Sequence, residues 1–151
     1  YTNGATIKNL TLENVTVKGN VNGALYIGAL AGYSNSSNIQ NIKLIGDNNV
    51  IENTGNTAYL YAGGVVGDIY LGSINSCDVT VSIKGNPTTG SKNIGGIIGY
   101  NNANNVFIKS SAKGKIINNS NQVVEENIGG LIGKFVGYRI YSSDRKNIFN
   151  R

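Results

Sequence analysis

Short runs of alternating apolar and polar residues recur along the chain, and most of their apolar members are branched at Cβ. Val15-Thr16-Val17 and Val79-Thr80-Val81-Ser82-Ile83 alternate with a period of two residues, which places their apolar side chains on one face of an extended strand. Lys115-Ile116-Ile117 repeats the pattern, and Val50-Ile51 is its weakest copy. Gly, Asn and Ser separate these runs, and no stretch shows helical periodicity. The pattern therefore predicts short strands joined by tight turns.

A glycine-rich block of seven residues occurs four times, with glycine at its second and sixth positions. The sixth-position glycines Gly32, Gly67, Gly99 and Gly133 are separated by 35, 32 and 34 residues, and the second-position glycines keep the same intervals. A fixed period of this length is typical of repeat proteins. The blocks are Ile27 to Tyr33 (IGALAGY), Ala62 to Asp68 (AGGVVGD), Ile94 to Tyr100 (IGGIIGY) and Ile128 to Lys134 (IGGLIGK).

A second repeated element is an isoleucine followed two places later by Asn or Ser. The isoleucines are Ile7, Ile39, Ile74, Ile108 and Ile140. We expect the polar residues two places after them to stack at a bend and to hydrogen-bond from coil to coil. These residues are Asn9, Asn41, Ser76, Ser110 and Ser142.

Three short strands per period cannot bury a face alone, but the same strands stacked from period to period enclose a shared core. Since crossovers between parallel strands are right-handed with few exceptions, the sequence predicts a right-handed parallel β-helix. Four blocks correspond to about four and a half coils of 32–35 residues each. We interpret residues 1–151 as a single all-β domain, a fragment of a longer protein.

Paired glycines within a predicted strand need a reason, because each costs about 1 kcal/mol relative to a residue with a side chain. Close packing of backbone against backbone supplies one. If residues 93–100 form one strand, Ile94 and Ile98 project from one face and Ile97 from the other. We therefore expect an additional layer that covers the glycine-rich sheet, from a loop, another chain or the rest of the parent protein.

Composition removes several kinds of chemistry. The chain has no His, which excludes a zinc peptidase motif and a Ser-His-Asp triad. Its one cysteine, Cys77, forms no internal disulfide, and we interpret it as a small core residue. Gly63-Gly64-Val65-Val66-Gly67-Asp68 departs from the calcium-binding β-roll motif. No catalytic residue, cofactor site or metal site is assigned, and no apolar run is long enough for insertion into a membrane.

Acidic residues are the remaining candidates for catalysis, because parallel β-helices also carry carbohydrate-active enzymes that use paired carboxylates. Asp47, Glu52, Asp68 and Asp78 lie at different positions of the period, and the sequence places no two of them together. Isolated solvated acids are the simpler interpretation.

Tyrosines and basic residues are the candidates for ligand contact. Eight of the nine tyrosines lie in or beside the repeated elements, where they either offer stacking platforms or cover the edge of the core. The net charge of +5 arises in residues 101–151, where eight basic residues stand against three acids, a density too low for nucleic-acid binding. The candidate contact residues are Tyr33 and Tyr100 with a hypothetical basic stripe of Lys109, Lys113, Lys115, Lys134 and Arg139.

The blocks resemble the GLUG repeat, whose core reads Gly-Gly-Leu-Val-Gly followed shortly by Ile-x-Asn-Ser. Gly129-Gly130-Leu131-Ile132-Gly133 and Ile74-Asn75-Ser76 carry the resemblance, which covers most of the chain. The chain departs from the pattern at Ala29 and Ala31, and two blocks end in Asp68 and Lys134 instead of Tyr. The resemblance implies a module of bacterial surface and secreted proteins, including adhesin-like proteins and the non-catalytic part of immunoglobulin A-specific metallopeptidases.

The function predicted from these observations is a non-catalytic β-solenoid module, extracellular or on the bacterial cell surface, that acts in adhesion or as a spacer. Host proteins or glycans and other domains of the parent chain are its expected partners, and its open ends favour end-to-end self-association. Two alternatives stay open: a substrate-positioning segment of a secreted immunoglobulin A-specific metallopeptidase, and a carbohydrate-active β-helix enzyme.

Overall fold

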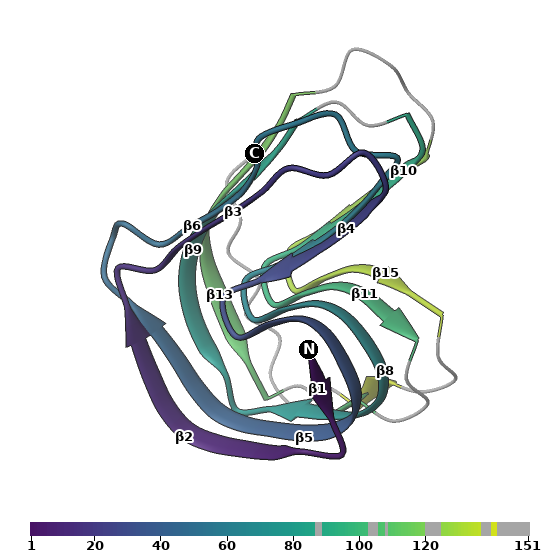
Figure 1. Cartoon of the computed structure of the whole chain (residues 1–151). Coiled ribbons are helices and arrows are strands. Elements are labelled where there is room, and N and C mark those ends of the chain that lie inside the picture. Colours follow the sequence, from purple (N-terminus) through teal and green to yellow (C-terminus); the bar gives the residue numbers. More distant parts are fainter. Residues whose placement is uncertain (87–88, 103–105, 108, 120–124, 137–139, 142–151) are drawn as a thin grey trace.

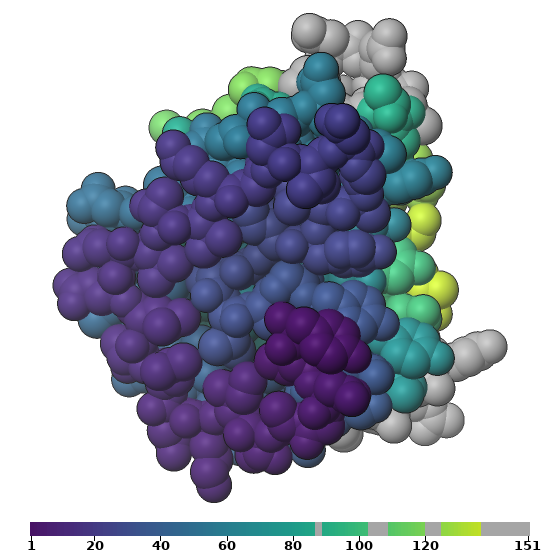
Figure 2. Space-filling view, in the orientation of Figure 1, coloured from purple at the N-terminus to yellow at the C-terminus, as the bar shows by residue number. Residues whose placement is uncertain are grey.

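The chain winds into a right-handed parallel β-solenoid of about four coils (Figure 1). The computed structural model describes residues 1–86, 89–102, 106–107, 109–119, 125–136 and 140–141. From the N-terminal coil, which lies nearest the viewer in Figure 1 and Figure 2, the chain runs clockwise as it recedes. Every strand pairing among the described residues is parallel, so each coil lies on the one before it.

The strands repeat in the same order from coil to coil. The first coil contains β1 (Thr2–Asn3), β2 (Thr6–Glu13), β3 (Thr16–Gly19) and β4 (Ala24–Gly28). The second contains β5 (Ala31–Ile45), β6 (Val50–Asn53) and β7 (Tyr59–Gly63), and the third β8 (Val66–Asn75), β9 (Asp78–Gly85) and β10 (Ser91–Gly95). The fourth contains β11 (Ile98–Asn102), β12 (Val106–Phe107), β13 (Ser111–Asn118) and β14 (Glu125–Gly129), and β15 (Ile132–Phe135) and β16 (Ile140–Tyr141) follow.

The strands form a ten-stranded, a four-stranded and a two-stranded sheet. The large sheet follows the order β15-β11-β8-β5-β9-β6-β3, with β1 and β2 also paired to β5 and β13 to β9. The four-stranded sheet has the order β14-β10-β7-β4, and β12 pairs with β16. The period predicted from the sequence is confirmed, since Gly28, Gly63, Gly95 and Gly129 stand in direct register.

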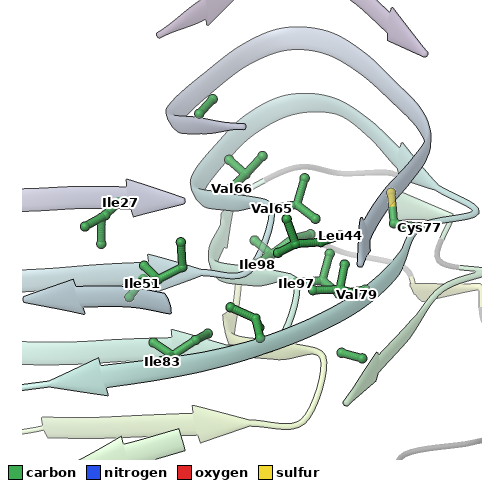
Figure 3. Close-up of a cluster of buried hydrophobic side chains, with 14 of the residues drawn as sticks. Ile27, Leu44, Ile51, Val65, Val66, Cys77, Val79, Ile83, Ile97 and Ile98 are labelled. Atoms are coloured by element: carbon green, nitrogen blue, oxygen red, sulfur yellow. The ribbon is translucent and has the colours of Figure 1, made fainter. Parts of the chain in front are cut away.

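Rows of aliphatic side chains fill the interior, one residue per coil (Figure 3). Because successive strands are in register, branched side chains from neighbouring coils stack and remove one another from water. Cys77 lies in this core, as predicted, and burial raises the pKa of its thiol. The rows include Leu12–Leu44–Val79–Ala112, Val17–Ile51–Ile83–Ile116 and Ile27–Ala62–Ile94.

The expectation that residues 93–100 form one strand is wrong. Each glycine block contains a turn between two strands, so β10 ends at Gly95, the chain reverses at Gly96-Ile97, and β11 begins at Ile98. The turns also stack, because the N–H of Ile97 donates to the carbonyl of Leu131 in the next coil (2.9 Å). We call this fold-back, at residues 24–33, 59–68, 91–100 and 125–134, the glycine arch; Figure 1 shows it as β4 and β10 running inward and returning as the layer of β11 and β15.

The two layers of the glycine arch explain the paired glycines. A Cβ on Gly67 would lie 2.6 Å from the carbonyl oxygens of Gly32 and Tyr61, and one on Gly99 would lie 2.5 Å from the N of Ala62. Backbone therefore packs against backbone, as predicted. The layer that covers the glycine-rich sheet is the next strand of the same chain, so the expected additional layer is not needed.

The predicted polar ladder holds for its first members. Asn9 and Asn41 lie side by side at the bend, and the Asn41 side-chain N–H₂ donates to Asn9 Oδ1 (2.8 Å). Both residues and Ser76 adopt φ between 52° and 59°. Ser110 departs from the prediction, because it is level with Cys77 and accepts a hydrogen bond from its N–H (2.9 Å). Ser142 lies outside the described residues.

Candidate ligand-binding surface

Two rows of side chains meet where the layers of the glycine arch open to solvent. The inner row comes from β4, β7, β10 and β14 and consists of Tyr26, Tyr61, Asn93 and Asn127 in register. The outer row comes from β5, β8, β11 and β15 and consists of Tyr33, Asp68, Tyr100 and Lys134. Both rows occupy fixed positions of the repeat, so the solenoid itself sets their spacing at about 4.8 Å per coil.

Five tyrosines form one aromatic group at these rows, which we call the tyrosine cluster: Tyr1, Tyr26, Tyr33, Tyr61 and Tyr100. Tyr26 and Tyr61 stack with their ring centroids 4.7 Å apart, and Tyr1 stacks on Tyr33 at 5.7 Å. Edge-to-face contacts join the rows, with Tyr26 at 5.7 Å from Tyr33 and Tyr61 at 5.5 Å from Tyr100. Such geometries are favourable for aromatic rings, so the cluster holds itself in place.

The position of Tyr26 follows from strand alternation. Leu25 and Ile27 point into the core, so Tyr26 between them points to the opposite face of β4 and is 39% exposed. Gly32 lies against the Tyr26 backbone, where a Cβ would overlap the carbonyl oxygen. This close approach of the two layers brings the Tyr26 and Tyr33 rings into contact.

Asp68 lies in the outer row between Tyr33 and Tyr100. Its side chain is almost fully buried, with 8% of the residue exposed, and Oδ1 has no hydrogen-bond partner. Burial raises the pKa of this carboxyl to about 6. Burial also raises the pKa values of Tyr26, Tyr33 and Tyr61, and the charge of Asp68 adds to each rise. The cluster therefore surrounds a carboxylate that is poorly solvated when ionised.

Polar pairs continue both rows toward the C-terminal end. Asn127 donates to Asn93 Oδ1 (3.0 Å), extending the inner row as an amide ladder. Lys134, at the end of the outer row, donates to Glu125 Oε1 (2.6 Å), and this hydrogen bond lowers the pKa of that carboxyl. Lys134 is therefore engaged with its own neighbour on β14.

The described members of the predicted basic stripe lie on different strands. Lys113 and Lys115 are exposed on β13, in register with Thr80 and Ser82 of β9, and Lys109 is exposed just before β13. Lys134 belongs instead to the outer row beside Tyr100. Arg139 lies outside the described residues.

The other candidate acids, Asp47, Glu52 and Asp78, lie on other strands and turns. Glu52 lies between Lys18 (3.4 Å) and Lys84 (3.9 Å), one coil to either side. Asp78 accepts a hydrogen bond from Ser111, and Asp47 borders a shallow groove over β9 and β13. Within the described ranges no three His, Cys, Asp or Glu residues lie close enough to hold a metal ion.

Lys92 is a buried charge that the sequence pattern did not reveal. It occupies a core row after Leu25 and Leu60, is 1% exposed, and donates to Asn118 Oδ1 (2.7 Å). Glu126, the next member of the row, lies 3.6 Å from its ammonium group. Burial lowers the pKa of Lys92, and the charge of Glu126 opposes this shift.

The sequence pattern identifies Tyr33 and Tyr100 as candidate contact residues but presents Asp68 as an isolated solvated acid. The signal that could have found it was its alignment with those tyrosines at the seventh position of the block. Tyr26 and Tyr61 also share a position, one residue before the block, but the sequence pattern gives no sign of the turn that brings this position close to the seventh position. Without the turn, the two tyrosine positions fall on a single strand, seven residues apart.

The fold and these rows define the chain as a parallel β-solenoid with an aromatic, carboxylate-containing surface along one side. The described part of the chain contains no helix that is long and apolar enough to cross a membrane. Comparison with known proteins finds no matching family model, no matching curated protein and no matching solved structure.

Proposed function

We propose that this chain is a non-catalytic β-solenoid module of a bacterial cell-surface or secreted protein, related to the GLUG repeat, and that it binds its partner through the tyrosine cluster. The glycine blocks and the isoleucine-polar elements support the relationship. The observation that carries the binding role is the gathering of five tyrosines into one aromatic group beside the nearly buried Asp68 at the mouth of the glycine arch.

An aromatic surface on an ordered backbone is suited to recognition. Tyrosine offers a large contact area and a polar hydroxyl with only two side-chain dihedrals to order. Three of the strands that carry the cluster, β5, β7 and β11, are hydrogen-bonded to a strand on either side, so the backbone beneath Tyr33, Tyr61 and Tyr100 is already ordered before binding. Partner proteins or glycans on a host surface are the ligands that this location and chemistry favour.

The spacer role follows from the same architecture. Each coil contacts its neighbours through continuous backbone ladders and aliphatic rows, and such stacks extend along one axis as coils are added. A module of this kind holds other domains of a parent chain at a fixed distance.

The binding role is tested with purified protein on a panel of glycans and extracellular-matrix proteins. The test variant is Tyr26→Ser with Tyr100→Ser, and the control is Tyr59→Ser with Tyr70→Ser, because Tyr59 and Tyr70 are exposed and make no ring contact with the cluster. We expect the native chain and the control to bind at least one member and the test variant to lose that binding. Equal binding by both variants overturns the role of the cluster.

A further inference from the structure

The Asp68 carboxylate, which lies beside the tyrosine cluster, is nearly buried and has no hydrogen-bond partner for its Oδ1. None of the ion pairs among the described residues includes Asp68, and its Oδ1 has no hydrogen-bond donor. The nearest cation in its row, Lys134, lies beyond Tyr100 and is already paired with Glu125. A carboxylate in this position costs free energy unless a positive group approaches it.

The rings around Asp68 are suited to such a group. Tyr33 and Tyr100 flank it in the same row, and Tyr61 is its neighbour across the arch. An aspartate side chain is several bonds shorter than a tyrosine, so the carboxylate lies below the level of the rings. Tyrosine faces attract cations through their quadrupole, and the attraction increases where water is excluded.

We propose that the tyrosine cluster and Asp68 together bind the side-chain ammonium group of a lysine on a partner protein. The proposal rests on the function proposed above and names the chemistry of its ligand. The ammonium N–H groups donate to Asp68, including the unpartnered Oδ1, and the straight methylene chain lies against the tyrosine rings.

Depth favours lysine over other ammonium compounds. Asp68 is 8% exposed, so a ligand must pass between the rings to reach it. In lysine a narrow, unbranched chain of four methylene groups carries the ammonium group, whereas the amine of an amino sugar is attached directly to a bulky ring. The rings that must part lie on outer faces, and Tyr26 is 39% exposed, so side-chain rotation suffices without movement of the strands.

The first experiment is a titration with n-butylammonium, which reproduces the end of a lysine side chain. Since the chain has nine Tyr and no Trp, its intrinsic fluorescence reports on tyrosine alone. At pH 7.5 and constant ionic strength we expect saturable binding with a Kd of about 1 mM, the range for a fragment of this size. Tetramethylammonium, which has the charge but no N–H, should bind at least about fivefold more weakly, because it donates no hydrogen bond, and 1-butanol should not bind.

Asp68→Asn keeps the shape of the side chain and removes its charge. We expect it to weaken butylammonium binding at least about tenfold, because a charge-assisted hydrogen bond is lost. Asp47→Asn removes an acid from a turn outside the cluster and should leave the affinity within about twofold. Tyr26→Leu, a second variant that leaves Asp68 in place, should also weaken binding by removing an aromatic face.

Three results overturn the proposal. If butylammonium binds Asp68→Asn as tightly as the native chain, the carboxylate is not part of the site. If tetramethylammonium binds as tightly as butylammonium, no hydrogen bond to the ammonium group is involved. If glucosamine binds as tightly as butylammonium, the site has no preference for lysine. If the native chain binds a partner on the panel but does not bind butylammonium, the assignment of lysine as the ligand is refuted and the proposed function is not. If the control with Tyr59→Ser and Tyr70→Ser loses partner binding, the result contradicts the proposed function instead, because it places the partner's binding site outside the tyrosine cluster.

Discussion

Gly67 packs directly on the backbone of Tyr61, so that a Cβ at position 67 would lie 2.6 Å from the Tyr61 carbonyl oxygen. The two residues stand on opposite layers of the glycine arch, six positions apart, with the turn of one block between them. This contact joins the fold to the binding surface, because the same close approach brings the Tyr61 ring beside Asp68 and Tyr100.

Gly67→Ala should therefore destabilise the protein severely. Its methyl group meets backbone atoms of Ile27 and Tyr61 in the facing layer and of Gly32 in the neighbouring coil, and room for it requires separation of the layers or the coils. We expect a loss of about 3 kcal/mol in the free energy of unfolding. Gly23→Ala is the control, since a Cβ added there would have no heavy atom within 4 Å, and it should change stability by less than about 0.5 kcal/mol. Urea denaturation distinguishes them, and similar midpoints would contradict the close packing of the arch.

The repeat and its register could be predicted from the sequence, because equivalent glycines and isoleucines stand one above another in a parallel solenoid. The turn inside each block could not. Ile94, Gly96 and Ile98 alternate with Gly95, Ile97 and Gly99, and this pattern fits a strand covered on both faces as well as two strands folded back on each other. Only the contact between backbones distinguishes the two arrangements. Because every residue has the same backbone atoms, this contact leaves no signal in the sequence.

The environment of Asp68 was hidden for a related reason. Burial of an acid depends on the layers that meet around it, and the facing tyrosine row belongs to the strand before the turn. Lys92 was hidden because a single lysine in an aliphatic row reads as a solvent-facing residue until its partners are placed. Its partners Asn118 and Glu126 are 26 and 34 positions away.

Asp68→Asn should stabilise the protein at neutral pH. The folded state holds the carboxyl pKa at about 6, above the ordinary value of 3.8, so folding takes up a proton between these values and stability falls as pH rises from about 4 to about 6. Above pH 6 the ionised group costs on the order of 3 kcal/mol, and the neutral amide of the variant avoids this cost. Unfolding curves of both proteins at pH 4 and pH 7 measure the difference in their free energies of unfolding. The contributions of the other carboxyl groups are the same in both proteins and cancel in this difference. A constant difference at the two pH values would contradict the burial of Asp68.

Glu126→Ala should cost more stability than Glu125→Ala, although the two residues are adjacent. Glu126 faces the buried Lys92 ammonium, and its removal should cost about 2 kcal/mol, because an ammonium group in the core loses its counter-charge. Glu125 pairs with Lys134 at the surface, where solvent screens the interaction, so its removal should change little.

The pH dependence of Glu126→Ala identifies the cause. Burial lowers the pKa of Lys92, and loss of Glu126 removes the charge that opposes this shift. The folded variant therefore releases the Lys92 proton at a lower pH, and its stability should approach that of the native protein as pH rises from about 7 toward about 10. A deficit that stays constant over this range would indicate lost packing instead of an uncompensated charge.

Asn41 provides a test of the stacked polar bend, because its two contributions are separable. Its φ of 52° is unfavourable for most side chains, and its amide donates to Asn9 Oδ1 (2.8 Å). Asn41→Ala loses the hydrogen bond and retains the strained backbone, so we expect a cost of about 1.5 kcal/mol. Asn41→Gly loses the same hydrogen bond but adopts positive φ freely, and should recover about 1 kcal/mol of that cost. Asn9→Ala removes the acceptor of the Asn41 hydrogen bond, at the equivalent position of the first coil, where φ is 59°. If the Ala and Gly variants of Asn41 unfolded at the same urea concentration, the left-handed bend would not be a source of strain, and the preference for Asn at this position would rest on the ladder alone.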